Sequence, residues 1–330
     1  MRASRCVVWE QLEAVLSEGS RAMLLYVLKS EGSSPGRRGF AMCVLADGNI
    51  RGTIGGGIME HKLVELAKAQ LASRITDIIL KEQHHTKDHP TDRSGMICSG
   101  SQYVALVPVA PHDLQTVHNL LTACQGEQPV RLVLGPSGLT CSEDLVTRDG
   151  LHFVSLTDWE YSEVIGVRPR VHIIGAGHVG LALSELMAGL GFYALIYDDR
   201  SQLNTLEQNV FAHEKHIVEY HQIGGVLSAN EDDYVVIMTF GYRTDKLVLE
   251  QLMGRRFRYI GMMGSDQKIA QMKEDWEREG VDPQAYAHVH APIGLPILSK
   301  TAGEIAVSIA AEIIREKNKD LPTGRTSPNL

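Results

Sequence analysis

The chain has 330 residues, of which 44% are hydrophobic and 22% charged, a composition typical of a globular protein and a length that predicts two domains. Its net charge of −8 excludes nucleic acid as the main partner, because phosphate backbones bind basic surfaces. Residues 1–150 hold 15 Lys and Arg against 16 Asp and Glu, so this near-neutral part tolerates an anionic ligand more readily than the remainder.

Targeting and redox signals are sparse. There is no apolar run of about 18 residues, so we expect no membrane span, and the first residues do not have the pattern of a signal peptide. The cysteines form no CxxC pair, which suits a reducing cytoplasm and predicts neither a disulfide framework nor a zinc knuckle. They are Cys6, Cys43, Cys98, Cys124 and Cys141.

The apolar pattern predicts a mixed α and β domain over 1–150. Helices are expected at 7–18, 58–73 and 113–124. Strands are expected at 22–29, 40–46, 50–54, 75–81, 102–109 and 130–134. Asp47-Gly48 stands between two of these strands and is a hairpin signal.

The pattern changes after a stretch at 151–169 that we interpret as a linker. Regular alternation of strands and helices then predicts a parallel sheet over 170–318. The expected strands are 170–175, 193–198, 216–219, 234–240 and 257–262, and the expected helices are 178–190, 244–254, 265–279 and 302–317. The fold class is therefore α/β, a mixed N-terminal domain followed by a Rossmann-type domain, and the polar tail at 319–330 is expected to be flexible.

A glycine-rich turn follows the first strand of the second domain. Gly175, Gly177 and Gly180 form the GxGxxG pattern between a strand and a helix, which is typical of dinucleotide binding. The first glycine permits a tight turn, the second lets the backbone approach a diphosphate, and the third lets the helix pack closely on the strand. His178 stands in the first helical turn, facing either a phosphate or solvent.

An acidic residue stands where a ribose ligand belongs. Asp198 lies 18 residues past the last glycine, at the end of the next expected strand. Its charge would favour NAD over NADP by repelling a 2′-phosphate, and Arg200 weakens that preference. The other interpretation is a Rossmann half that has lost its ligand.

Two loops of the first domain are candidates for binding an anion. Arg37 and Arg38 lie in a loop rich in Gly and Ser, which suits a phosphate. Gly55, Gly56 and Gly57 join a strand to a helix, and their free N–H groups are expected to hold an anion, or else to form a helix cap with Glu60.

Two further segments have a chemical and a structural interpretation. Cys98 stands among small residues that give access to a thiol, and is either a nucleophile, sulfur carrier or metal ligand, or a small buried side chain. Thr301 and Glu304 precede an apolar run with the spacing of a capping box, which predicts a helix start.

Taken together and in this order, these segments resemble the XdhC/CoxI family, the accessory proteins of molybdenum hydroxylases such as xanthine dehydrogenase. The resemblance runs over roughly 10–317. Its segments are 32–39, 47–48, 52–57 with Glu60, 95–98, 174–180, 198–200, 259–265, 290–295 and 304–314.

The resemblance implies a chaperone that binds the molybdenum cofactor, a molybdopterin, holds it while a cysteine desulfurase supplies a sulfido ligand, and inserts it into the hydroxylase apo-enzyme. It also implies a homodimer, with Cys98 as a sulfur carrier or a contact to molybdenum. Arg37, Arg38 and the glycines at 55–57 would hold the pterin phosphate, with Glu60 among the cofactor-binding residues. The Rossmann site would bind NAD(P) or a nucleotide part of the cofactor.

This interpretation favours a carrier without catalysis of its own. The alternative is an NAD-dependent oxidoreductase acting on a small molecule. Tyr242 and His290 are the best candidates for its acid or base, but neither has an evident partner in the sequence.

Overall fold

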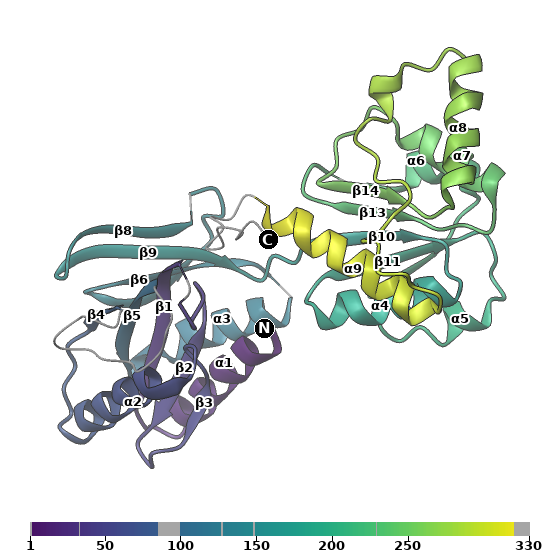
Figure 1. Ribbon diagram of the computed structural model, residues 1–330. Coiled ribbons are helices and arrows are strands. Elements are labelled where there is room, and N and C mark those ends of the chain that lie inside the picture. Colours follow the sequence, from purple (N-terminus) through teal and green to yellow (C-terminus); the bar gives the residue numbers. More distant parts are fainter. Residues whose placement is uncertain are drawn as a thin grey trace. The chain divides into compact units, whose positions relative to one another are not determined.

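A computed structural model describes residues 2–32, 34–84, 100–126, 128–147, 149–228 and 230–319 of the chain (Figure 1). The chain divides into two compact units, with the boundary between Val167 and Arg168. Apart from Lys319, the expected tail at 319–330 lies outside the described residues.

The first unit contains a larger antiparallel sheet, ordered β3-β2-β1-β5-β4, and a smaller one, ordered β7-β6-β9-β8. Its elements are α1 (Arg2–Ser17), β1 (Ala22–Gly32), β2 (Ala41–Leu45), β3 (Ile50–Gly52), α2 (Gly57–Ala72), β4 (Ile79–His84), β5 (Gly100–Val109), η1 (Pro111–Asp113), α3 (Leu114–Gln125), β6 (Val130–Gly135), β7 (Gly138–Ser142), β8 (Gly150–Ser155) and β9 (Asp158–Ile165). The predicted helices and strands of 1–150 are confirmed, although β4 begins four residues later than expected.

Strand β1 lies at the centre of the larger sheet and is buried on both faces. Leu24 and Tyr26 pack with helices α1 and α3, whereas Met23 and Leu25 pack with α2 on the opposite face. Because side chains alternate along a strand, two covered faces require an unbroken apolar run, which is how the sequence revealed this strand.

The stretch at 151–169 differs from the expected linker. It carries most of β8 and all of β9, and β9 pairs with both β6 and β8. Trp159 and Tyr161 are buried, and they alternate with the exposed side chains of Asp158 and Glu160. Because the side chains on the outer face of β9 are polar, the sequence pattern indicated a linker. The inner face of the strand is apolar and is part of the first core.

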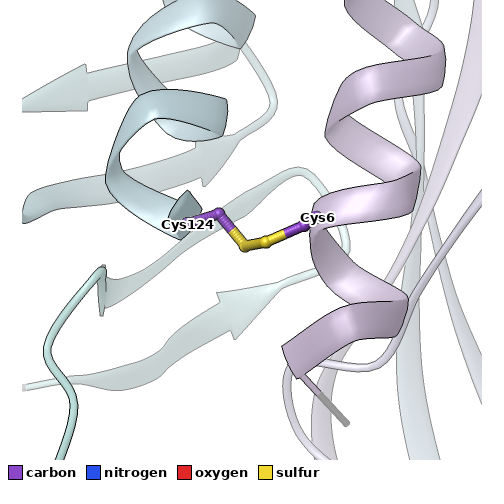
Figure 2. Close-up of a disulfide and its surroundings, with 2 residues drawn as sticks. All are labelled: Cys6 and Cys124. Carbon is purple, nitrogen blue, oxygen red and sulfur yellow. A yellow bond between two sulfur atoms is a disulfide. The ribbon is translucent and has the colours of Figure 1, made fainter. Parts of the chain in front are cut away.

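A disulfide joins Cys6 on α1 to Cys124 at the end of α3 (Figure 2). The two residues are 118 positions apart, and their Cα atoms lie 5.7 Å apart. The prediction that the cysteines form no disulfide was wrong for this pair, because spacing along the chain does not show which helices pack together. The disulfide also removes one argument for a reducing compartment.

The described part of the second unit contains one five-stranded sheet. All of its strands are parallel, in the order β12-β11-β10-β13-β14. This confirms the predicted Rossmann-type architecture. Its elements are β10 (Arg170–Ile174), α4 (His178–Gly189), β11 (Tyr193–Asp198), α5 (Asn204–Glu207), β12 (Glu214–Ile217), η2 (Tyr220–Gln222), α6 (Ile223–Val226), β13 (Tyr234–Ile237), α7 (Tyr242–Leu252), β14 (Tyr259–Met262), α8 (Asp266–Arg278), η3 (Pro283–Ala285) and α9 (Ala302–Asn318).

Helices cover both faces of this sheet. Helices α4 and α9 lie side by side on one face, with Leu183 and Ile309 among the residues of that core. Helices α6, α7 and α8 cover the other face, with Leu249 and Met272 in the second core. Burial on both faces explains the apolar runs that predicted the strands.

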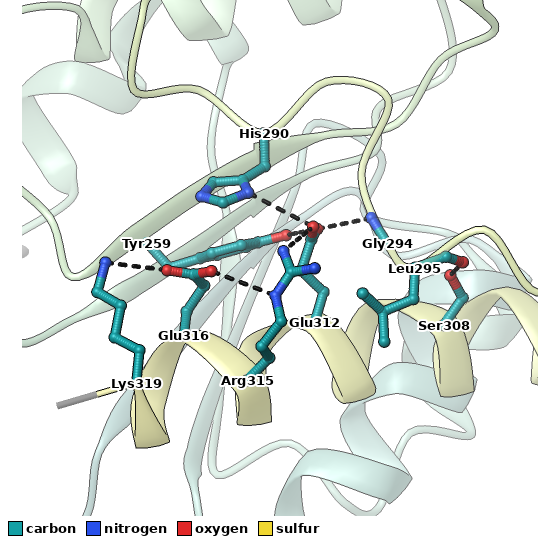
Figure 3. Close-up of polar contacts among 9 residues, drawn as sticks. All are labelled: Tyr259, His290, Gly294, Leu295, Ser308, Glu312, Arg315, Glu316 and Lys319. Carbon is teal, nitrogen blue, oxygen red and sulfur yellow. Dashed lines mark hydrogen bonds and ion pairs between the residues drawn. The ribbon is translucent and has the colours of Figure 1, made fainter. Parts of the chain in front are cut away.

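A buried carboxylate on helix α9 fixes the loop between η3 and α9 and the end of a side chain from β14 (Figure 3). Glu312 accepts hydrogen bonds from the Tyr259 hydroxyl at 2.7 Å, the Gly294 N–H at 2.8 Å and the Arg315 guanidinium at 2.9 Å, and His290 Nδ1 lies 3.5 Å from it. Burial and the hydrogen bond to Glu312 raise the pKa of Tyr259. Three donors on one carboxylate explain how Glu312 tolerates burial.

The start of α9 confirms the predicted capping box. Thr301 Oγ1 accepts a hydrogen bond from the Glu304 N–H at 3.3 Å, and the Glu304 carboxylate accepts one from the Thr301 N–H at 3.0 Å. Within the described ranges, no helix has the length and apolar character needed to cross a bilayer.

Candidate functional site

The glycine-rich turn between β10 and α4 has a different requirement at each glycine. Gly175 has φ of +118°, and a Cβ there would lie 2.2 Å from the Met238 carbonyl oxygen. A Cβ at Gly180 would lie 2.3 Å from the Gly175 carbonyl oxygen, so α4 approaches the turn closely only because both residues lack side chains. Gly177 differs, since a Cβ there would meet nothing within 4 Å.

A cavity of about 630 Å³ lies at the carboxyl ends of the parallel strands. This volume is within the usual range for small-molecule and cofactor sites, and the central strand β10 is the switch point where such sites form. Its lining follows β10, β11, β13 and β14, and consists of Gly177, His178, Val179, Gly180, Arg200, Gln202, Leu203, Asn204, Thr205, Met238, Thr239, Phe240 and Met263.

The N-terminus of α4 opens into this cavity. No side chain of the described residues caps the helix at Gly177, so the N–H groups of the first turn have no side-chain acceptor. His178 is exposed and lines the cavity beside them. Free N–H groups, together with the positive end of the helix dipole, favour a phosphate or diphosphate at this position.

Asp198 lies at the end of β11 and is fully buried. One carboxylate oxygen accepts hydrogen bonds from the Ala176 N–H at 2.7 Å and Arg200 Nη2 at 2.9 Å. The other accepts from the Arg200 N–H at 3.0 Å and Arg200 Nε at 2.8 Å. Burial alone would raise the pKa of Asp198, but the hydrogen bonds from Arg200 and Ala176 outweigh it and lower the pKa. The structure thus joins this acid to the glycine turn.

A polar group that sequence reasoning missed lies beside the cavity, after β13 and β14. Asp245 is buried and accepts hydrogen bonds from the Thr239 N–H at 2.8 Å and the Thr239 hydroxyl at 2.6 Å. Lys268 Nζ forms an ion pair with Asp245 and donates to the Met263 carbonyl at 3.0 Å. A threonine two residues after a buried strand, followed by an acid in the next helix, was the available signal.

In the first unit, Glu60 occupies the donors of the second glycine loop. Its carboxylate accepts hydrogen bonds from the Thr53 hydroxyl at 2.6 Å and from the Ile54 and Gly56 N–H groups, both at 2.9 Å. The Gly55 N–H donates to Thr53 Oγ1 at 3.1 Å. In this arrangement the loop fits its own carboxylate rather than the phosphate of a pterin cofactor.

The two anion loops of the first unit contact each other through their backbones. A Cβ at Gly55 would lie 2.4 Å from the Gly36 nitrogen, and a Cβ at Gly36 would lie 2.2 Å from the Ile54 carbonyl oxygen. The buried Gln102 side chain accepts hydrogen bonds from the Ser34 hydroxyl at 2.8 Å and the Gly36 N–H at 3.2 Å. The sequence placed these loops near each other only through their connecting hairpin.

The arginines of the first loop are exposed and fit a phosphate better than the glycines do. Arg37 donates to the Ser34 carbonyl at 2.9 Å, and Arg38 lies 3.6 Å from the Asp149 carboxylate. Cys98 lies outside the described residues. Gly100, two positions later, begins β5 and pairs with Gly32 at the end of β1 from which the arginine loop departs.

Across the described part of the chain, no three His, Cys, Asp or Glu side chains gather in a metal-binding group. The expected molybdenum contact, Cys98, is in the segment at 85–99, which the structure does not describe.

Comparison with known proteins identifies both units. The family model described as XdhC Rossmann domain matches residues 171–313, and the one described as XdhC and CoxI family matches residues 15–80. The uncharacterized protein YqeB of Escherichia coli K12 is 26% identical over 295 residues, which cover 88% of this chain but 43% of YqeB, so the chain spans less than half of that relative.

Two further relatives match over nearly their whole length. A Bacillus subtilis 168 protein described as a probable subunit of xanthine dehydrogenase is 22% identical over 330 residues, covering 93% of this chain and 97% of the relative. A solved structure described as a xanthine dehydrogenase from Bacillus halodurans superposes with a TM-score of 0.69 at 23% identity, covering 98% of both chains, and so shares the fold. The two family matches fall in the two units in the same order as the motifs, and the chain belongs to the XdhC/CoxI family.

Proposed function

We propose that the protein is an accessory factor in the maturation of a xanthine dehydrogenase-type molybdenum hydroxylase. It would bind the molybdenum cofactor, hold it during sulfuration by a cysteine desulfurase, and insert it into the apo-enzyme in the cytoplasm. Family membership and the two relatives named as xanthine dehydrogenase proteins support the hydroxylase as the partner. The carrier acts as a homodimer in this proposal.

The observation that carries the nucleotide part of the proposal is the uncapped N-terminus of α4 opening into the cavity of about 630 Å³. Such an opening supports a diphosphate at Gly177 and His178, either of NAD(P) or of a nucleotide part of the cofactor. Gly175 and Gly180 hold the turn in shape around it.

The first unit is proposed to hold the pterin end of the cofactor. The exposed guanidinium groups of Arg37 and Arg38 suit the phosphate. Gly55, Gly56 and Gly57 would take part only after the Glu60 carboxylate leaves their loop. The thiol of Cys98 would either contact molybdenum or carry sulfur.

The test is to purify the full chain without oxygen from a host that makes molybdenum cofactor and to assay molybdenum and oxidised pterin per chain. Arg38→Ala and Cys98→Ala should lower the pterin content, whereas Arg21→Ala, which removes an exposed arginine elsewhere in the first unit, should not. Absence of pterin from the unaltered protein in such a host would contradict the carrier proposal.

The polar group Thr239–Asp245–Lys268 favours one second candidate, an NAD-dependent oxidoreductase acting on a small molecule. It offers a lysine ammonium beside the cavity, held by a buried carboxylate. Steady oxidation of NADH with a small carbonyl substrate, abolished by Gly177→Ala and by Lys268→Met, would support catalysis over carriage as the main function.

A further inference from the structure

The end of the cavity between β11 and β13 carries an aromatic ring and a guanidinium. Arg200 follows β11 and Phe240 follows β13, and the guanidinium carbon lies 5.9 Å from the centre of the Phe240 ring. Phe240 is 88% exposed, although it is a large apolar side chain. An exposed aromatic face beside a cavity is a suitable surface for stacking a nucleotide base.

The carboxylate of Asp198 has no capacity left for a ribose. A carboxylate offers about four acceptor positions. Here the Ala176 N–H, the Arg200 N–H and two groups of the Arg200 guanidinium fill them. Two ribose hydroxyls would have to displace Arg200 or the glycine turn to bind Asp198 as they do in NAD sites.

Arg200 is therefore the group that meets the ligand at this end. It uses Nε and one N–H of Nη2 for Asp198, which leaves Nη1 and the second N–H of Nη2 available on a side chain that is 41% exposed. Asp198 also fixes the orientation of the guanidinium plane. A fixed guanidinium with free N–H groups matches the oxygens of a phosphate.

The charge of the cavity agrees with this. Its described lining residues include Arg200 and His178 but no carboxylate side chain. Asp198 lies buried behind the guanidinium, and the nearest oxygen of Asp199 is 3.8 Å from Arg200 Nε. An anionic group entering from the cavity thus meets donors before it meets either acid.

We propose that this site selects a dinucleotide with a phosphomonoester on the ribose next to its base, the class of NADP rather than NAD. Arg200 binds the phosphomonoester, Phe240 stacks against the base, and the α4 N-terminus holds the diphosphate. Asp198 is a positioning residue that fixes Arg200 and the Ala176 N–H. This deepens the nucleotide-binding part of the proposed function and rests on it.

The experiment titrates the full chain with NADPH, NADH, adenosine 2′,5′-bisphosphate and 5′-AMP, using calorimetry and the fluorescence of the reduced nucleotides. In the unaltered protein NADPH should bind at least tenfold more tightly than NADH, and the bisphosphate at least tenfold more tightly than 5′-AMP. The fragment comparison needs no variant and so does not depend on whether a variant folds.

Variants then assign the residues. Arg200→Ala should weaken NADPH at least tenfold while changing NADH by less than threefold. Arg200→Lys, which keeps a cation beside Asp198, should retain part of the preference. Phe240→Ala should weaken both dinucleotides equally. Arg243→Ala removes an exposed arginine of α7 that does not line the cavity, and should change neither affinity.

The outcomes separate this inference from the proposal beneath it. Binding of NADH as tight as that of NADPH overturns the inference and leaves a nucleotide site. Failure of all four ligands to bind overturns both the inference and the nucleotide part of the proposed function. The pterin assay of the first unit stands apart from either result.

Discussion

Gly177→Ala and Gly175→Ala add the same methyl group two residues apart, and the structure predicts a small loss of stability for the first and a large loss for the second. At Gly177 the methyl meets no atom within 4 Å, and the backbone has φ of −68°, which alanine adopts readily. Loss of glycine at the N-cap should cost the fold only about 1 kcal/mol. For a unit of this size that corresponds to a fall in Tm of about 2–4 °C.

At Gly175 the methyl would lie 2.2 Å from a backbone oxygen, at φ of +118°. Backbone strain costs about 1–3 kcal/mol. Steric overlap costs about another 1–3 kcal/mol. The fall in Tm of the second unit should therefore be at least twice that of Gly177→Ala.

Gly177→Ala, which keeps the fold, should nevertheless lose dinucleotide affinity. A methyl at Gly177 occupies the approach of the diphosphate to the N–H groups of α4, so dinucleotide affinity should fall at least tenfold, or about 1.4 kcal/mol. Thermal denaturation and fluorescence titration measure the two effects on the same samples. Unchanged dinucleotide affinity in Gly177→Ala would refute the placement of the diphosphate, and unchanged stability in Gly175→Ala would refute the reasoning about the turn.

Three further predictions concern stability. Burial lowers the pKa of His172 below its usual value of about 6.5. The unfolded chain therefore binds the proton more readily, so the second unit should be most stable above that pH and lose stability as the pH falls below it. Urea midpoints measured from pH 7.5 to 5 should fall less steeply in His172→Gln, and an unchanged slope would count against this. The Cys6–Cys124 disulfide joins residues 118 positions apart, which stabilises by roughly 5 kcal/mol in the chain-entropy account. Reductant should therefore lower the Tm of the first unit but leave that of a Cys6→Ser variant unaffected. Equal Tm values with and without reductant in the unaltered protein would contradict this. Arg131 is buried and donates hydrogen bonds to the Asp144 carbonyl at 2.7 Å and the Asp149 carboxylate at 2.8 Å. Arg131→Met should therefore lower the free energy of unfolding by about 2 kcal/mol and speed proteolysis between 143 and 149. An unchanged cleavage rate would show that the loop keeps its conformation without Arg131.

Local sequence patterns predicted the second unit well because each of its strands and helices has a distinct apolar pattern of its own. Each buried parallel strand is a short apolar run, and each helix between them has one apolar face, so the order of elements emerges without knowledge of the packing. The glycine turn was predictable because its three glycines lie within six consecutive residues between a strand and a helix. Strand β9 was missed because Asp158 and Glu160 on its outer face made a half-buried strand resemble a polar connection.

The chemistry of the sites depended on contacts that a sequence does not show. Spacing placed Asp198 at the end of its strand, yet its hydrogen bonds to Ala176 and Arg200 arise from how the turn and the loop after β11 approach it. Likewise, Glu60 was recognised as a helix cap or a ligand residue, but its occupation of the glycine-loop donors required the folded backbone.

The attachment of α9 sets an order for folding during synthesis. Among the described residues, the buried core of the first unit lies within 8–165, so this core can form as soon as that stretch leaves the ribosome. On one face of the second sheet, Ala306, Ile309 and Ile313 of α9 pack beside α4, and Glu312 of the same helix secures the loop between η3 and α9. Until these residues emerge, the first core of the nascent chain is followed by a sheet on which only α4, through residues such as Leu183 and Met187, covers the face that α9 later shares. That interval is when the chain most needs protection from aggregation.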